Sequence, residues 1–596
     1  MRIRHIIISA ALLPLLSGCY DLNKEPEGVL STANPFTSTG EMTSYLNQFY
    51  ETGVKDQNFG YGAVTGIADG DHQSDNLATS APITRINGTL TVAGSTQLTD
   101  YTYIRNVNFF LNNIHNIGDQ SSAAYRQAVG EGYYFRAYYY FRLFKSYGRI
   151  AWVSKPLDPD LSEMQLPREN RTVIADSILA DLDKAIANLP EQNSSATMRV
   201  HRDVARAFKS EVALYEATWE KYHKQKNDEF FDPTVTDAKI QDYLNQAVSA
   251  AKAVIDRGVW QVYSTGNPLQ DYRVLFQTED LSSNPEVLFF KHYDGANIGN
   301  NVDRMLNEGG GTTGVTASLV DDYLTRDGRP FVGTEKDEAK KVYGRELSPE
   351  LRDPRLGQTV VRPGQQLRPD EGPYTVPPLN GSAYKQNVTG YSILKHVQID
   401  YTGNLDAEYK GATPGIQYRY ADILLNYAEA LAELGGAQHA SEIVAALHPL
   451  RARVGMPDVD FDREYNTDAD YPFRSLDKYV QAVRRERRVE TALEGKRFDD
   501  IARWAAADVL LVGKRPVGAL FIGSDLENAY GGTLKYDQAS GNNIFLTGKA
   551  GDSERYILPY DSQDGWQFNV HRDYLLPLQP RMISLTGGLW EQNPGW

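Results

Sequence analysis

The most constraining feature of the sequence is the segment 123–147, whose second half is crowded with aromatic side chains. If this segment is helical, residues 133, 137, 140, 144 and 147 share one face and residues 134, 138 and 141 share another. A helix that is apolar on both faces has to be buried between two layers of a protein. A stripe of rings that binds a sugar or a cofactor is the alternative, and core packing is favoured over it. The aromatic residues are Tyr133, Tyr134, Phe135, Tyr138, Tyr139, Tyr140, Phe141, Phe144 and Tyr147.

Helical patterns recur along the chain and predict a mainly α fold. Several neighbouring segments form hairpins close to the tetratricopeptide length of about 34 residues, which predicts a scaffold of tetratricopeptide-like hairpins without a regular array. Two stretches rich in Gly, Pro and Asn, at about 260–417 and 513–579, predict a large irregular, loop-rich region that carries short strands. The further helices are expected at Thr43–Tyr50, Ile104–Ile117, Arg171–Leu189, Asp203–Tyr222, Ile240–Arg257, Tyr418–Leu434 and Ala440–Val454, and strands at Val287–His292 and Tyr391–Val397.

The N-terminus has the pattern of a processing signal. Two arginines precede a largely apolar stretch, Ile6–Leu16, which is too short to span a bilayer. Leu16-Ser17-Gly18-Cys19 follows, which is the bacterial lipobox pattern, and Cys19 is the only cysteine in 596 residues. We therefore expect a lipoprotein signal peptide over 1–18, acylation of Cys19 and a lipidated tether over 19–36. An ordinary secretory signal that carries a cysteine by chance is the alternative.

Charge and cysteine content exclude several classes of function. The chain has 61 Lys and Arg against 77 Asp and Glu, a net charge of −16. An acidic chain does not suit nucleic-acid binding, which needs clustered positive charge. A single cysteine leaves no disulfides, no thiolate zinc site and no cysteine nucleophile in the processed chain. No nucleotide or zinc motif stands out, and no cofactor is expected.

One acidic segment, Asp69–Asn76, resembles a calcium loop superficially. It contains three carboxylates, but it lacks the glycine and the distal glutamate of an EF-hand. A surface turn or a ligand-binding loop is favoured over a structural cation site.

A second charged segment begins at Arg484-Arg485-Glu486-Arg487-Arg488 and continues through Glu490, Glu494, Arg497, Asp500 and Arg503. Glutamates one helical turn apart with arginines between them predict a helix whose charges pair locally and dock it to its neighbours.

Several blocks, in order along the chain, closely resemble the RagB/SusD family. They cover nearly the whole processed chain. One departure is Ala151-Trp152, where the family usually has a proline, and it affects only a loop. The blocks are Glu131–Phe141 with Tyr147-Gly148, Leu319–Tyr323, Arg352–Arg355, Tyr418–Ala430, Arg451–Pro457, Arg484–Arg488, Glu494–Asp500 with Arg503-Trp504, Leu575–Leu578 and Gln592–Trp596.

The resemblance implies a helical SusD-like domain over 37–596 with an irregular ligand-binding face. It implies a nutrient-binding lipoprotein, held by its lipid anchor in the outer membrane and facing the exterior, and a SusC-like TonB-dependent transporter as partner. Oligosaccharides are the usual ligands of the family and peptides the exception, so both remain open. The resemblance implies a binding protein and not an enzyme.

The matching blocks are structural, so the ligand residues are inferred separately, from loops in the N-terminal third and in the 260–310 region. Tyrosine suits polar ligands because it combines a flat apolar face with a hydroxyl. The candidate ligand-binding residues are Tyr61, Asp75, Asn76, Arg85, Tyr101, Tyr103, Tyr293 and Asn297.

Two other functions remain open at this point. A helical glycoside hydrolase needs a pair of carboxylates roughly 5–10 Å apart, and no sequence feature isolates such a pair. A protein-interaction scaffold built on helical hairpins would associate with a transporter and bind no glycan or peptide.

Overall fold

The computed structural model describes residues 35–596 apart from 61–62, 95–97, 158–164, 400–403 and 406. The predicted signal peptide, Cys19, most of the predicted tether and Tyr61 lie outside the described residues. Within the described part of the chain, no helix is both long and apolar enough to cross a membrane.

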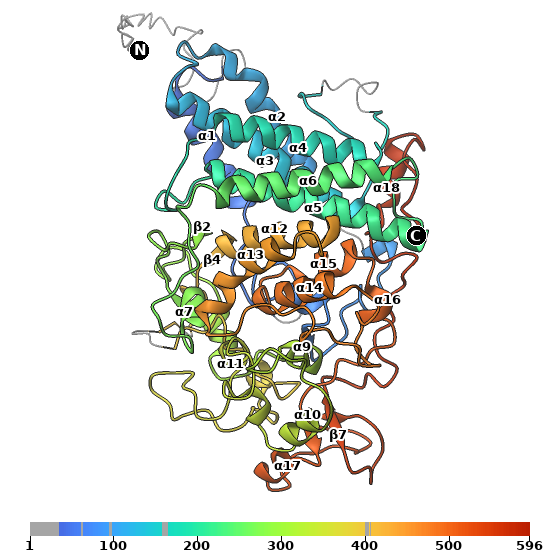
Figure 1. Cartoon of the computed structure of the whole chain (residues 1–596). Helices are drawn as coiled ribbons and strands as arrows, with labels where there is room; N and C mark the ends of the chain where they lie inside the picture. Colours follow the sequence, from blue (N-terminus) through green and yellow to red (C-terminus); the bar gives the residue numbers. More distant parts are fainter. Residues whose placement is uncertain (1–34, 61–62, 95–97, 158–164, 400–403, 406) are drawn as a thin grey trace, which may run out of the picture.

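Long helices lying side by side make up the upper two thirds of the molecule (Figure 1). They follow one another in space, because α2 packs on α3, α3 on α4, α4 on α5, α5 on α6, α6 on α12, and α12 on both α13 and α14. The predicted mainly α fold is confirmed. The bounds are α1 Thr39–Thr52, α2 Asp100–Asn113, α3 Ala123–Tyr147, α4 Arg171–Asn188, α5 Arg202–Lys226, α6 Asp237–Ile255, α12 Tyr420–Gly435, α13 Ala440–Arg453, α14 Lys478–Glu490 and α15 Arg497–Arg503.

Short helices and strands are scattered through the remaining chain, which is mainly irregular. The strands form two antiparallel pairs, β1 with β3 and β2 with β4, and an antiparallel sheet of order β5-β7-β6. The bounds are α7 Asp271–Gln277, α8 Val302–Leu306, α9 Ala317–Asp322, α10 Gly333–Lys340, α11 Leu356–Thr359, α16 Ala507–Leu510, α17 Asp525–Ala529, α18 Pro580–Leu585, β1 Leu77–Thr79, β2 Val287–Lys291, β3 Thr313–Val315, β4 Gly415–Arg419, β5 Leu520–Ile522, β6 Phe545–Leu546 and β7 Arg555–Leu558.

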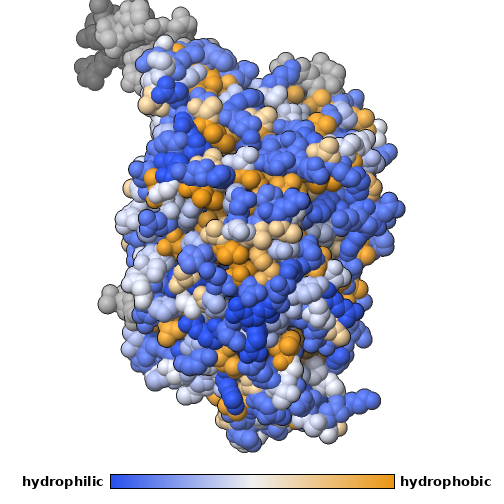
Figure 2. Space-filling view, in the orientation of Figure 1, coloured by the Kyte–Doolittle hydropathy of each residue, from blue (hydrophilic) through white to orange (hydrophobic). Residues whose placement is uncertain are grey.

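Of the two strands predicted in the loop-rich region, one is confirmed and one is wrong. β2 lies within the predicted Val287–His292. The predicted strand Tyr391–Val397 is irregular chain, in which Ile393 forms an isolated bridge with Val360. The apolar residues of this segment predict a strand because they fill a second hydrophobic core. This core also contains Leu493 and Phe521 and lies beneath the loop-rich part of the molecule. The surface seen in Figure 2 is mainly polar, with apolar residues in small groups.

The aromatic helix α3 has the predicted bounds because both of its ends carry strong signals. The Oγ of Ser122 accepts a hydrogen bond from the Tyr125 N–H, and Gly148 ends the helix with a φ of 67°. One face packs on α5, where the ring of Tyr134 lies 5.5 Å from that of Phe208. The other face packs on α1, where Phe135 lies 5.7 Å from Phe49. Burial between two layers is therefore confirmed.

The charged segment beginning at Arg484 differs from the prediction in two ways. The helix ends at Glu490 and a second helix begins at Arg497, because Leu493 and Gly495 adopt φ values of 62° and 66°. Its carboxylates pair mainly with arginines far away in the chain and not locally. Glu490, which is fully buried, binds Arg453 at 2.6 Å, Arg419 at 2.7 Å and Arg355 at 2.9 Å. Local pairing is confirmed for Asp500, which binds Arg503 at 2.8 Å. For the glutamates the expectation of local pairing is wrong, because spacing alone does not distinguish an exposed charged face from a buried one.

The loop Asp69–Asn76 is buried against this segment, so the expected surface turn is wrong. The Asp71 carboxylate accepts hydrogen bonds from the Asn76 amide at 2.9 Å and from the Leu493 N–H at 2.8 Å. Asp75 pairs with Arg497 at 2.7 Å and Arg488 at 2.9 Å. Arginines thus supply the positive charge beside the loop Asp69–Asn76, where the sequence left a cation site open. Among the described residues, no group of three or more His, Cys, Asp or Glu side chains is arranged to hold a metal ion.

Three buried histidines predict that acid destabilises the protein. Burial lowers the pKa of His72, His201 and His396 to about 4, from about 6.5. Below pH 6.5 these histidines therefore become protonated in the unfolded chain but stay neutral in the folded chain. The free energy of unfolding consequently falls as the pH falls from 6.5 toward 4. Asp69 acts in the opposite direction, because burial raises its pKa to about 6.

Urea denaturation between pH 7 and pH 4.5 measures this loss. We expect the midpoint to decrease steadily over that range, and His201→Gln to flatten the dependence by about a third. An identical slope in the variant would contradict the assignment of a neutral His201 to the fold.

Candidate functional site

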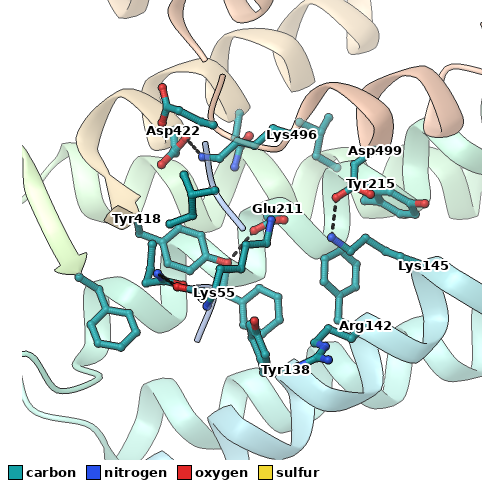
Figure 3. A pocket seen from close by; sticks show the side chains of 18 of the residues that line it. Lys55, Tyr138, Arg142, Lys145, Glu211, Tyr215, Tyr418, Asp422, Lys496 and Asp499 are labelled. Carbon is teal, nitrogen blue, oxygen red and sulfur yellow. Dashed lines mark hydrogen bonds and ion pairs between the residues drawn. The ribbon is translucent and has the colours of Figure 1, made fainter. Parts of the chain in front are cut away.

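A narrow cleft lies where α3 and α5 face β4, α12 and α15 (Figure 3). Its volume is about 80 Å³, enough for a few ordered water molecules. The lining residues come from positions as distant as Lys55 and Arg503, so the cleft exists only in the folded chain.

Aromatic side chains form one wall of the cleft. Phe141 on α3, Phe208 and Tyr215 on α5 and Tyr418 on β4 are buried, whereas Tyr138 on α3 is partly exposed. The hydroxyl of Tyr418 donates to Glu211 Oε2 at 2.6 Å. Burial, together with the charge of Glu211, raises the pKa of Tyr418 well above 10, so its hydroxyl stays protonated. The ring of Tyr138 is the aromatic surface of the cleft that a ligand can reach.

Charged side chains form the rim, and most of them are neutralised within it. Lys145 Nζ lies 2.5 Å from Asp499 Oδ2, and Lys496 pairs with Asp422. Figure 3 shows these two pairs on either side of the cleft, with Lys55 between them. Carboxylates, ammonium groups and a reachable ring are the groups that hold hydroxylated ligands in protein sites.

Backbone contacts fix the position of Lys55. Its N–H donates to the side-chain oxygen of Gln417 at 2.8 Å, and its carbonyl accepts from the Gln417 amide at 2.8 Å. Because Gln417 lies in β4, the segment that follows α1 is attached directly to the opposite wall. The break at Leu493–Gly495 that separates α14 from α15 places Lys496 on the same rim.

The structure places four of the predicted ligand residues in packing roles. Asp75 and Asn76 are each 1% exposed and belong to the arginine network, so the expectation that they are exposed in a loop is wrong. Arg85 donates to the carbonyls of Asp573 and Tyr574, both at 2.9 Å, and its guanidinium stacks on Phe498. Tyr293 is 3% exposed and its hydroxyl binds Gln57 N at 3.0 Å, so it is not exposed in a loop either.

The remaining described candidates lie on separate parts of the surface. Tyr101 and Tyr103 are half-buried on α2, where the Tyr101 hydroxyl donates to the Ala151 carbonyl at 2.8 Å and Tyr103 stacks on Tyr139 at 5.0 Å. Asn297 is exposed in a turn held by Asp294. The structure does not bring the eight candidates together, and whether any of them contacts a ligand stays a prediction.

Sequence reasoning missed the cleft, although one signal for it was present. Tyr138, Arg142 and Lys145 are spaced four and three residues apart, so they share one face of α3. Two cations in line with an aromatic ring interrupt the mainly apolar stretch from Ala137 to Tyr147. That break marks the place where the helix leaves the core and faces the cleft.

Comparison with known proteins gives the family context. A model of the SusD family matches residues 285–596, and a model described as "Starch-binding associating with outer membrane" matches residues 31–214. SusD-like protein P38 of Formosa agariphila is 23% identical over 466 residues, which cover 73% of this chain and 78% of that protein.

Solved structures show the same fold at low identity. A SusD-like carbohydrate-binding protein from Bacteroides fragilis superposes with a TM-score of 0.68 at 20% identity, covering 93% of this chain and 99% of that one. Surface glycan-binding protein A from Bacteroides fluxus gives a TM-score of 0.58 at 17% identity, covering 94% of this chain and all of that one, 100%.

Proposed function

Because the chain belongs to the SusD family, we propose that it is a cell-surface lipoprotein that captures oligosaccharides and delivers them to a SusC-like TonB-dependent transporter. Acyl chains on Cys19 anchor it in the outer membrane with the folded body facing the exterior. The protein binds its cargo without breaking bonds in it.

The cleft between α3, α5 and β4 is the observation that carries the proposal for this chain. Tyr138 offers a ring face to a sugar, and Lys55 and Glu211 offer a donor and an acceptor to its hydroxyl groups. The names of two structural neighbours, a carbohydrate-binding protein and a surface glycan-binding protein, describe ligands of this chemistry for those proteins.

Capture of this kind gives moderate affinity. Each net hydrogen bond contributes about 0.5–1.5 kcal/mol, so several have to act together. The narrow cleft, of about 80 Å³, admits a substituent and the adjoining edge of a sugar ring, so the rest of an oligosaccharide extends over the rim. Moderate affinity suits a protein that hands its cargo on.

Replacing Tyr138 with alanine is expected to weaken oligosaccharide binding about tenfold, since a stacked ring contributes about 0.5–1.5 kcal/mol beyond the area it buries. Isothermal titration of the mature protein against a glycan panel measures the affinity. Tyr103→Ala is the matched control, because Tyr103 is also a half-buried tyrosine but lies on α2, outside the cleft. The melting temperature of both variants verifies that they fold.

Other results would redirect the proposal. Loss of binding in Tyr103→Ala alone would place the ligand at α2, as the sequence predicted. Shortening of a polysaccharide incubated with the purified protein would make it a glycoside hydrolase, and binding of peptides alone would make it a peptide-binding member of the family. Failure of the protein to copurify with a TonB-dependent transporter from native membranes would reject the delivery step.

A further inference from the structure

Most charged side chains around the cleft belong to ion pairs, and among the described residues Lys55 and Glu211 are the exceptions. Lys145 and Lys496 have their own carboxylates, and the Arg142 guanidinium lies 3.3 Å from Asp100. Deeper in the cleft, Arg487 binds Asp500 at 3.0 Å. None of the ion pairs among the described residues includes Lys55.

The ammonium group of Lys55 has one weak partner. Its Nζ donates to the Gly495 carbonyl at 3.5 Å. An ammonium group has three donors and no acceptor, so most of its hydrogen-bonding capacity is directed into the cleft. Burial and the neighbouring charge of Lys145 lower the pKa of Lys55, and the charges of Asp499 and Glu211 offset this shift in part. Such a charge is costly to enclose unless an anion comes with the ligand.

The carboxylate of Glu211 limits which ligands can bind in the cleft. Its Oε2 is held by the Tyr418 hydroxyl, which leaves Oε1 as an acceptor on the same cleft. A group that presents only negative charge would be repelled there. An acidic sugar unit satisfies both sides, because its carboxylate or sulfate accepts from Lys55 while a ring hydroxyl donates to Glu211.

We infer that the cleft selects an anionic saccharide, with the charged substituent against Lys55 and the sugar ring against Tyr138. This inference rests on the proposed function and specifies its ligand. The cleft volume of about 80 Å³ suits one charged substituent and the adjoining edge of a ring. An acidic protein with a net charge of −16 would thus recognise an acidic glycan through Lys55, a cation of the cleft that has no ion-pair partner.

Isothermal titration with matched probes tests the inference on the mature protein. Uronic-acid oligosaccharides of several linkages are compared with their own methyl esters, which remove the charge and keep the shape. Sulfated neutral oligosaccharides distinguish a sulfate ester from a carboxylate. We expect the charged forms to bind roughly tenfold or more tightly than the esters, the effect of a charge-assisted hydrogen bond, and raised salt to reduce that difference.

Lys55→Gln should remove the preference, so that acid and methyl ester bind the variant with equal affinity. Lys514→Gln, at an exposed lysine outside the cleft, should change neither affinity. If Lys55→Gln does not fold, the difference in affinity of the wild-type protein for acid and methyl ester tests the inference by itself.

The outcomes separate the two levels of the proposal. Equal affinity for acid and ester overturns the inference and leaves oligosaccharide capture standing. An acidic peptide that binds as tightly as the acidic saccharide also overturns the inference. Binding of neutral glycans alone also overturns it. If no saccharide of either kind binds, the proposed function fails together with the inference.

Discussion

Replacing Glu490 with alanine is expected to lower the free energy of unfolding by about 3–5 kcal/mol, because removing one member of a buried ion-pair network leaves the charge of its partners less well compensated. The side chains of Glu490, Arg419 and Arg453 are all 0% exposed, and that of Arg355 is 1% exposed. Without the carboxylate, these three guanidinium groups would lose the partner they share. Arg453 would keep Glu286 at 3.3 Å, Arg419 would keep Glu286 and Glu494, and Arg355 would keep Asp353 and Glu486.

Chemical denaturation monitored by circular dichroism measures this effect. Glu490→Gln keeps the volume and part of the hydrogen bonding, so we expect it to fall between the wild type and the alanine variant. Glu338→Ala is the matched control, because Glu338 forms an ion pair with Lys341 at the surface, and surface pairs contribute little. It should leave the denaturation midpoint unchanged.

The ion pairs of Glu490 also predict how the stability of the protein depends on pH. Burial alone would raise the pKa of Glu490, but Arg453, Arg419 and Arg355 outweigh it and lower the pKa to about 2, from 4.5. A carboxyl group whose pKa is depressed on folding stabilises the protein fully above pH 4.5 and loses that contribution as the pH falls toward 2. The difference between wild type and Glu490→Gln should therefore shrink below pH 4.5. A difference in stability between wild type and Glu490→Gln that is small at pH 7, or that does not change with pH, would mean that the other carboxylates around these arginines compensate their charge without Glu490.

The helices could be predicted wherever the signal is local. The bounds of α3 follow from a serine cap, a glycine stop and the aromatic periodicity between them, all of which are contained in residues 122–148. The charged segment shows the limit of this reasoning. Glu486 and Glu490 have the same spacing whether their helix is exposed or buried, and their partners Arg355, Arg419 and Arg453 are brought in by tertiary packing.

The candidate site could not be predicted for the same reason. Lys55 reaches the cleft through its backbone contacts with Gln417, 362 positions further along the chain. Lys496 reaches it through a left-handed turn at Leu493 and Gly495, where a non-glycine residue in that conformation gives no sequence signal. The predicted ligand residues were chosen as polar or aromatic residues in loops, and Asp75, Asn76 and Tyr293 are buried because loops in this protein have a core of their own.

Replacing Cys19 with serine is expected to move nearly all of the protein out of the outer membrane. Each buried CH₂ group of an acyl chain contributes about 0.8 kcal/mol, one chain binds reversibly, and two or more hold a protein almost permanently. The net charge of −16 disfavours binding of the folded body to anionic lipid. Labelling of cells with a palmitate analogue, followed by fractionation, measures both acylation and location. We expect the variant to lose the label completely and to lose exposure to protease on intact cells.

The double variant Cys19→Ser, Ser31→Cys is the control for the position of the thiol. It restores one cysteine to the chain but places it outside the Leu-Ser-Gly-Cys pattern, so it should remain unlabelled. If acylation followed the thiol to position 31, any accessible cysteine would suffice and the lipobox would carry no information. If Cys19→Ser instead stayed in the outer membrane after extraction at high pH, the body would be held there by contacts with another protein, and the transporter proposed as its partner would be the first candidate to delete.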